Sequence, residues 1–317
     1  MLKTRTLRTV DELIRSGLAE EASRAALDDV SARYAIAIPP TLRALIDKPG
    51  DPIGLQFVPD PAELITAAHE SDDPIADLAL SPVPGIVHRY PDRALLKPLL
   101  ACPVYCRFCF RREQVGPDGG LLSEPELGAA YAYLAARREI REVILTGGDP
   151  LILSPRRLGE ILRALSAIPH LEILRIHTRV PVADPALITP ALLDALDIDK
   201  PLFIAAHINH ASELTTEAQS ACQKIQRLGI PILGQTVLLA GVNDSEAALG
   251  ELFRAMLRTR IKPYYLHQLD PAPGTARFHV PIERGRQMLA NLRGHISGTA
   301  LPAYILDRPG GLGKITL

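Results

Sequence analysis

Three closely spaced cysteines are the first residues of this sequence that could do chemistry. Cys102, Cys106 and Cys109 follow an apolar run with the spacing C-x3-C-x2-C. Three thiolates on one loop can hold three irons of a [4Fe–4S] cube, and the fourth iron then stays open to an exogenous ligand. An open iron indicates catalysis and not simple electron storage. The alternatives are three packed structural cysteines, or a three-thiolate zinc site that recruits a fourth ligand.

The remaining composition bounds the class of protein. Four cysteines in 317 residues are too few for a disulfide scaffold, and we expect the fourth, Cys222, to pack in the core. With 35 basic and 36 acidic side chains, the chain has no overall attraction to nucleic acid or anionic lipid. The first residues lack an apolar signal core, and no run reaches the roughly 18 apolar residues of a membrane span. We therefore expect a cytoplasmic protein that binds neither nucleic acid nor membrane.

The secondary structure around the cysteines must hold them in place. From residue 94 onward, apolar runs alternate with longer amphipathic stretches. The apolar runs, typical of parallel strands buried on both faces, are 94–101, 142–146, 171–177, 202–207, 231–239 and 263–269. The helix-like stretches are 123–138, 154–168, 185–196, 212–228, 245–260 and 281–293. After the first interval the strands recur roughly every 30 residues, the length of one βα unit. Six units predict an α/β fold, a partial (βα)6 TIM-like barrel with its chemistry at the carboxyl ends of the strands.

Three segments follow from this pattern. Residues 1–90, with short amphipathic helices at 10–18, 20–34 and 40–46 and then Pro/Asp-rich connections, are expected to form an N-terminal helical cap. Residues 91–295 form the barrel, and residues 296–317 form a short C-terminal segment. The polar residues at the predicted strand ends are Cys102, 147–149, 177–179, 207–210, 241–244 and Asp270.

The cysteine spacing, with the aromatic Phe108 just before the last cysteine, resembles the radical S-adenosylmethionine enzymes, whose fold is commonly a partial barrel. The resemblance implies that the open iron binds the amino and carboxylate groups of S-adenosylmethionine, which one-electron reduction cleaves to a 5′-deoxyadenosyl radical. It places Phe108 along the adenine and the glycine-rich segment 147–149 at the methionine amino group. The residues implied to bind S-adenosylmethionine are Phe108, Gly147, Gly148, Asp149, His207 and Gln235.

Five further segments narrow the resemblance to the lysine 2,3-aminomutase family, from about Asp51 to the C-terminus. These segments are 88–93, 106–112, 177–181, 264–270 and 307–314. The family holds pyridoxal 5′-phosphate on a lysine after a glycine-rich turn, and Lys314 matches it. The resemblance also assigns Arg89, Tyr90 and Arg93 to this cofactor. The alternatives are a flexible tail lysine and arginines in surface ion pairs.

The same resemblance assigns the substrate contacts. Arg111 would bind the substrate carboxylate, and Asp270 and Asp307 the distal ammonium. Two carboxylates suit a buried ammonium, which is costly to desolvate, and they gauge the length of the side chain. Alternatively, Asp270 starts a turn before Pro271 and Asp307 is solvated. The implied reaction is an isomerisation that moves the α-amino group of L-lysine from C2 to C3 and gives β-lysine.

Other functions stay open at this stage. Compact relatives that act on a lysine of translation elongation factor P share the short chain length and the residue sequence of 264–267. Asp307 and the residues just before Lys314, in contrast, are more similar to those of the free-lysine enzymes. The chain would then act in the factor's β-lysylation pathway. A cluster-binding electron carrier and a scaffold protein are further classes. The resemblance implies an electron donor such as flavodoxin or ferredoxin, and the sequence leaves open whether the chain forms a homo-oligomer.

Overall fold

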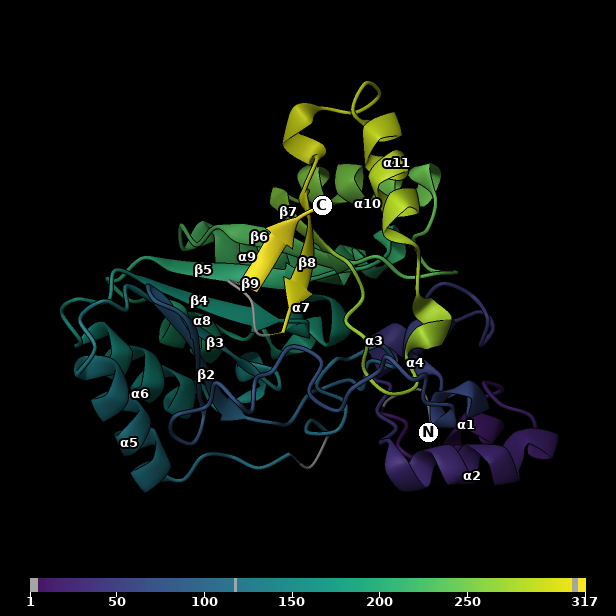
Figure 1. The fold of residues 1–317 in the computed structure, drawn as a ribbon, viewed down its shortest axis with the longest axis horizontal. Coiled ribbons are helices and arrows are strands. Elements are labelled where there is room, and N and C mark those ends of the chain that lie inside the picture. The colour runs from purple at the N-terminus through teal and green to yellow at the C-terminus, as the bar shows by residue number, and fades with distance from the viewer. Residues whose placement is uncertain (1–4, 117–118, 310–312) are drawn as a thin grey trace.

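One mixed sheet organises the molecule. The structure is a computed structural model that describes residues 5–116, 119–309 and 313–317. Nine strands follow one another in chain order, and β2 to β8 run parallel (Figure 1). The strands are β1 (Ile86–Tyr90), β2 (Arg93–Leu99), β3 (Glu142–Gly147), β4 (Ile173–Thr178), β5 (Leu202–His207), β6 (Ile232–Val237), β7 (Ile261–His267), β8 (Ala303–Arg308) and β9 (Gly313–Thr316). The sheet curls into a nearly closed partial barrel, which confirms the predicted fold.

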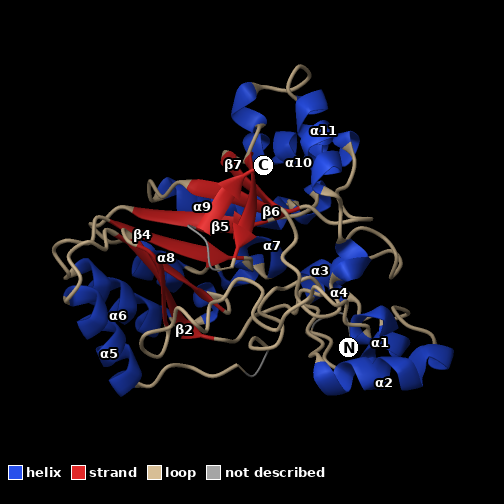
Figure 2. Ribbon diagram, in the orientation of Figure 1, coloured by secondary structure: helices blue, strands red, loops and turns tan. Residues whose placement is uncertain are grey.

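Helices lie around this sheet, as Figure 2 shows in blue around red strands. Those of the barrel are α5 (Glu124–Ala135), η4 (Pro150–Ile152), α6 (Pro155–Ser166), α7 (Val180–Ala183), η5 (Pro185–Leu187), α8 (Pro190–Leu196), η6 (Ala211–Glu213), α9 (Thr216–Arg227), α10 (Glu246–Arg258), η7 (Ala276–Phe278), α11 (Ile282–Leu292) and η8 (Gly298–Ala300). All six predicted helical stretches are present. The stretches 185–196 and 212–228 are each interrupted, because Thr189 and Thr215 provide new N-caps for α8 and α9.

Three strands were not predicted. β1 pairs antiparallel with β2 at one edge of the sheet, and β9 pairs antiparallel with β8 at the other. These hairpins carry charged residues such as Arg89 and Asp307, so they lack the continuous apolar run that marks the inner strands. β1 lies in the part assigned to the cap, and β8 and β9 lie in the C-terminal segment. The division into three domains stays a prediction.

The N-terminal helices pack against the loop that carries the cysteines. They are α1 (Val10–Arg15), η2 (Glu21–Ser23), α2 (Arg24–Arg33), α3 (Pro40–Arg43), α4 (Gly54–Phe57) and η3 (Pro61–Leu64). α1 and α2 gather at one side of the sheet (Figure 1). Their apolar cluster includes Leu13, Leu42 and Phe57 and also takes in Val104, which follows Cys102. Among the helices of the described residues, none has the length and apolar character to cross a membrane.

A close backbone approach fixes the carboxyl end of β3. Gly147 has a φ of 101°, a conformation that residues with a side chain rarely adopt. A Cβ on the next residue, Gly148, would lie 2.0 Å from the carbonyl oxygen of Ala101. The chain after β3 therefore runs directly against the residue that precedes Cys102. Glycine at both positions brings the second strand end next to the first cysteine.

Replacing Gly148 with alanine tests this approach. Because the new methyl group would overlap backbone atoms, we expect Gly148→Ala to lower the free energy of unfolding by about 1–3 kcal/mol. Gly128 is the matched control, since it lies exposed on α5 with open space around its Cα. Gly128→Ala should raise stability by about 0.5–1 kcal/mol. Denaturant unfolding of the iron-free protein measures both effects, and equal stability of the two variants would contradict the account.

Candidate active site

One cavity inside the barrel collects nearly all the residues that the sequence marked. Its volume is about 450 Å³. Fifteen of the sixteen candidate residues line it, namely Arg89, Tyr90, Arg93, Cys102, Cys106, Phe108, Cys109, Arg111, Gly148, Asp149, His207, Gln235, Asp270, Asp307 and Lys314. Gly147 does not line the cavity and acts through the shape of the turn. The structure thus brings the three thiols and the lysine near the chain's end to the walls of one space.

The three thiols lie on the loop that follows β2, residues 102–112, here called the cysteine loop. Burial raises the pKa of each thiol, and nearby negative groups add to this at Cys102. Arg179 opposes the shift at Cys106, because its Nη1 donates a hydrogen bond to the sulfur at 3.2 Å. A metal-binding thiolate at Cys106 would be compensated by the positive charge of this donor. Within the described ranges, no three His, Cys, Asp or Glu side chains form a preassembled site for a single metal ion.

Asp149, at the end of β3, is occupied by donors from the next strand end. Its Oδ1 accepts from the Thr178 hydroxyl at 2.7 Å, and its Oδ2 accepts from the backbone N–H of Arg179 at 2.6 Å. The N–H groups of Leu151 and Val180 complete the set. Burial raises the pKa of Asp149, and these donors oppose the shift. Asp149 therefore ties the end of β3 to the end of β4.

Phe108, His207 and Gln235 form another part of the wall. The rings of Phe108 and His207 lie 5.6 Å apart between centroids, tilted by 57°. Gln235 is the register partner of His207 on β6. Burial holds the pKa of His207 well below its ordinary value, so the ring is neutral, and its Nε2 pairs with Asn209 at 3.1 Å. This part of the wall is aromatic and uncharged, which suits an aromatic base.

Lys314 lies on β9, opposite Asp307 on β8. Its Nζ pairs with Asp307 Oδ2 at 2.5 Å, and Arg89 Nη1 pairs with Asp307 Oδ1 at 2.5 Å. The Tyr90 hydroxyl accepts from the backbone N–H of Lys314 at 2.8 Å, so β1 and β9 are joined across the gap in the barrel. Arg93 stacks over the Tyr90 ring at 3.7 Å. A Cβ at Gly313 would overlap that ring, and its φ is 88°. The preceding part of the glycine-rich turn, residues 310–312, lies outside the described residues.

Asp270 and Asp307 lie at the same end of the cavity. Burial, with the nearby charge of Asp307, raises the pKa of Asp270 to about 7. Among the described residues, the Asp270 Oδ1 atom has no hydrogen-bond partner. Asp307, by contrast, is neutralised by Arg89 and Lys314. The predicted pair of carboxylates is therefore present, with one member engaged by the protein's own cations.

Arg111 is held by a residue that the sequence analysis did not single out. Asp77 is 2% exposed and accepts from Arg111 Nε at 2.8 Å and Nη2 at 2.7 Å. Asp77 lies 34 residues upstream, in the Pro/Asp-rich connection, after Ala76 with a φ of 58°. The contact leaves Nη1 of the guanidinium for a ligand. No periodicity or motif marks Asp77, so only the folded chain reveals it.

Arg179 is a well-connected side chain that the sequence analysis left without a role. It belongs to the segment 177–181, which carried part of the resemblance, and it lies at the end of β4. Its Nη2 donates to Gln56 Oε1 and Glu213 Oε2, both at 2.7 Å. Its position at the carboxyl end of a predicted strand could have marked Arg179 as a candidate site residue from the sequence alone. Gln56 and Glu213 carried no such signal, because their partners lie far away in the sequence.

Comparisons with known proteins agree with this geometry. Residues 96–252 match the model of the radical SAM superfamily. The crystal structure of Streptococcus suis SuiB bound to S-adenosylmethionine superposes with a TM-score of 0.51 and 11% identity, over 69% of this chain and 51% of that one. At this identity the likeness concerns the fold alone. The fold and the three-cysteine loop define a radical SAM enzyme.

Curated relatives are more specific. The L-lysine 2,3-aminomutase of Acetoanaerobium sticklandii is 39% identical over 93% of this chain and 71% of its own length. That of Escherichia coli is 37% identical over 97% of this chain and 90% of its own length. The glutamate 2,3-aminomutase of Clostridioides difficile is 36% identical over 92% of this chain and 69% of its own length. The chain belongs to the lysine 2,3-aminomutase family, and it is an isomerase with aminomutase function. The cofactors of this family are a [4Fe–4S] cluster, S-adenosylmethionine and pyridoxal 5′-phosphate.

Substitution of Asp270 tests the electrostatics of the cavity. Because the pKa of Asp270 rises from 3.8 to about 7, the folded protein retains a proton that the unfolded chain releases. The resulting stabilisation is complete below about pH 4 and is lost as the pH rises through about 7. We expect the melting temperature of the ligand-free Asp270→Asn variant to equal that of the wild type near pH 4 and to exceed it above pH 7.

Asp29, exposed on α2, provides the control, since Asp29→Asn should leave the pH dependence unchanged. Differential scanning calorimetry between about pH 4 and 9 makes the comparison. A difference between Asp270→Asn and wild type that stays constant over this range would show that Asp270 is an ordinary carboxylate.

Proposed function

We propose that this protein is a pyridoxal phosphate-dependent lysine 2,3-aminomutase that converts L-lysine to β-lysine. The observation that carries the proposal is the single cavity lined by Cys102, Cys106, Cys109 and Lys314. The cluster and S-adenosylmethionine, when bound, supply a radical that abstracts hydrogen, and pyridoxal phosphate supplies a conjugated ring that stabilises the unpaired electron as nitrogen migrates. The protein must hold these groups and the substrate in contact and exclude water.

The residues around Lys314 fit pyridoxal phosphate. Arg89, Tyr90 and Arg93 come from the β1–β2 hairpin and lie beside Lys314, although they are more than 200 residues away in the sequence. Within the described residues, Arg89 Nη2 is buried without a hydrogen-bond partner. A guanidinium with a free donor suits a phosphate, which accepts several charge-assisted hydrogen bonds. We therefore assign the phosphate to Arg89 and Arg93, with Tyr90 fixing the backbone of Lys314.

The carboxylates beside Lys314 favour a substrate with a cationic side chain. Lys314 already places an ammonium against Asp307, so this position accepts a cation. A cofactor bound at Lys314 would leave Asp307 Oδ2 available to the substrate ammonium, and Asp270 would then lose its proton in response to the new positive charge. Arg111, held by Asp77, would bind the substrate carboxylate. These contacts would fix both ends of lysine inside the cavity.

Anaerobic turnover tests the proposal. Reconstituted protein with S-adenosylmethionine, pyridoxal phosphate, dithionite and L-lysine should form β-lysine, separable from α-lysine by chromatography. L-Glutamate is the matched control, because Asp270 and Asp307 would repel its distal carboxylate, and we expect no β-glutamate. Product only in the presence of elongation factor P would refute the first choice and support action in that factor's modification pathway. A stable cluster without any amino-acid product would support an electron carrier.

Lys314→Ala tests the assigned lysine separately from turnover. Incubation with pyridoxal phosphate should give the wild type an absorbance near ~420 nm from the lysine-bound cofactor, and the variant should lack it. Iron content should be unchanged, since the cysteines are intact. Lys224, exposed on α9, is the matched control, and Lys224→Ala should absorb like the wild type. An unaltered spectrum for Lys314→Ala would assign the cofactor to another lysine.

A further inference from the structure

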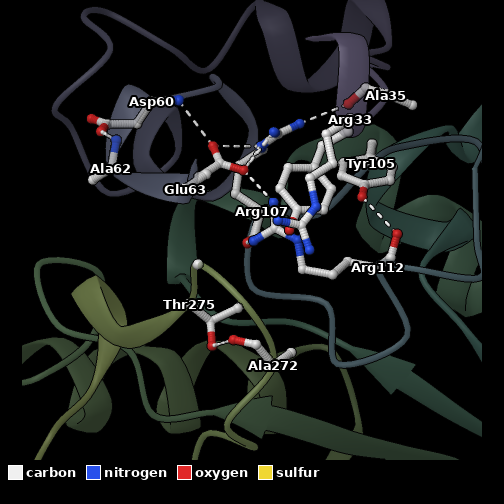
Figure 3. Close-up of polar contacts among 12 residues, drawn as sticks. Arg33, Ala35, Asp60, Ala62, Glu63, Tyr105, Arg107, Arg112, Ala272 and Thr275 are labelled. Carbon is white, nitrogen blue, oxygen red and sulfur yellow. Dashed lines mark hydrogen bonds and ion pairs between the residues drawn. The ribbon is translucent and has the colours of Figure 1, made fainter. Parts of the chain in front are cut away.

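Glu63, on η3, is the anion at which two arginines of the cysteine loop meet. Arg107 lies between Cys106 and Cys109, and Arg112 follows three residues after Cys109. Figure 3 shows Arg107 facing the Glu63 carboxylate, with Arg112 beside it. Arg107 Nε lies 2.9 Å from both Glu63 oxygens, and its Nη2 donates to Oε2 at 2.5 Å. Arg112 Nη2 donates to the same Oε2. The three side chains have no exposed surface.

The other donors of these arginines hold backbone carbonyls. Arg107 Nη1 donates to Ala35 O at 2.7 Å, which joins the loop to the N-terminal helices. Arg112 Nη1 donates to the carbonyl of Arg107 at 3.0 Å, and the Tyr105 hydroxyl donates to the carbonyl of Arg112 at 2.9 Å. These hydrogen bonds link residues 105, 107 and 112 to one another and so fix the conformation of the segment that contains Cys106 and Cys109. The shape of the segment therefore depends on where Glu63 holds the two guanidinium groups.

The charge of Glu63 is needed because the guanidinium groups are removed from water. Burial opposes ionisation of Glu63, but Arg107 and Arg112 outweigh burial and lower the pKa of the carboxyl below its ordinary value. Arg277 approaches the other oxygen, with Nη2 at 3.4 Å from Oε1, and also pairs with Asp60. Glu63 in turn accepts from the N–H of Asp60 at 2.9 Å, which fixes its position at the start of η3.

We propose that Glu63 is a positioning residue for the iron–sulfur cluster. By holding Arg107 and Arg112, it sets the backbone of the cysteine loop so that Cys106 and Cys109 reach neighbouring irons. The role concerns cluster assembly, so it does not depend on the substrate. It also gives the N-terminal segment a function in cofactor binding, although that segment contributes no cluster ligand. Residues behind metal ligands commonly control the geometry and affinity of a site in this way.

Glu63→Gln tests the proposal, because it keeps the shape of the side chain and removes its charge. The variant, verified as folded by circular dichroism, is reconstituted anaerobically with iron and sulfide. We expect loss of the cluster to an iron chelator to be roughly tenfold faster than in the wild type. We also expect the reduced cluster to give an altered electron paramagnetic resonance signal, with and without S-adenosylmethionine. A purely structural role would lower the melting temperature and leave both cluster properties unchanged.

Glu113 provides the matched control. It also links the loop region to the N-terminal helices, through Arg33 at 3.0 Å and the Tyr34 hydroxyl at 2.9 Å, but this pair is partly exposed. Glu113→Gln should keep the wild-type cluster signal and stability toward chelator. Should Glu63→Gln fail to fold, Arg112→Lys decides the matter, since lysine keeps the charge but cannot reach Glu63 and the Arg107 carbonyl together. Wild-type cluster properties in a folded Glu63→Gln variant would overturn the proposal. If that variant does not fold, wild-type cluster properties in Arg112→Lys would overturn it.

Discussion

Compensation of buried charge is the constraint on which this site depends. The carboxyl ends of the parallel strands meet inside a nearly closed barrel, where an ionised group without a partner is costly. The arginines and the lysine that line the cavity are accordingly matched: Arg111 with Asp77, Arg179 with Glu213, Arg93 with Asp92, Arg175 with Glu142, and Arg89 and Lys314 with Asp307. The cofactors and substrate of an aminomutase are themselves charged. Binding them in this cavity would exchange internal ion pairs for pairs with the ligands.

The two groups of candidate site residues come from opposite ends of the strand order. The cysteine loop follows β2, whereas Lys314 belongs to β9, the last strand in the order. An open sheet would keep these edges apart. Curling of seven parallel strands brings them together, and the bond from Lys314 N–H to Tyr90 closes the gap with β1. The curvature of the barrel therefore brings residues 102 and 314 to the wall of the same cavity.

The features that could be predicted from the sequence are those that a local residue pattern encodes. Continuous apolar runs located six inner strands, amphipathic stretches located the helices between them, and the C-x3-C-x2-C spacing marked the loop whose three thiols line the cavity. The hairpin strands β1, β8 and β9 escaped because their charged residues interrupt the apolar run. Carboxylates such as Glu63 and Asp77 were not predicted as site residues for a different reason. They lie in irregular connections, and their arginine partners, 44 and 34 residues away, become neighbours only in the folded chain.

The central claim is that one chamber holds both the iron–sulfur cube and the vitamin B6 derivative. A crystal structure of the oxygen-free protein loaded with iron, sulfide, S-adenosylmethionine and pyridoxal phosphate measures this most directly. We expect electron density for iron at the sulfur atoms of Cys102, Cys106 and Cys109, and continuous density from Lys314 Nζ to the cofactor, in the same cavity. Density for either group at other residues, or for the two groups in separate cavities, would contradict it.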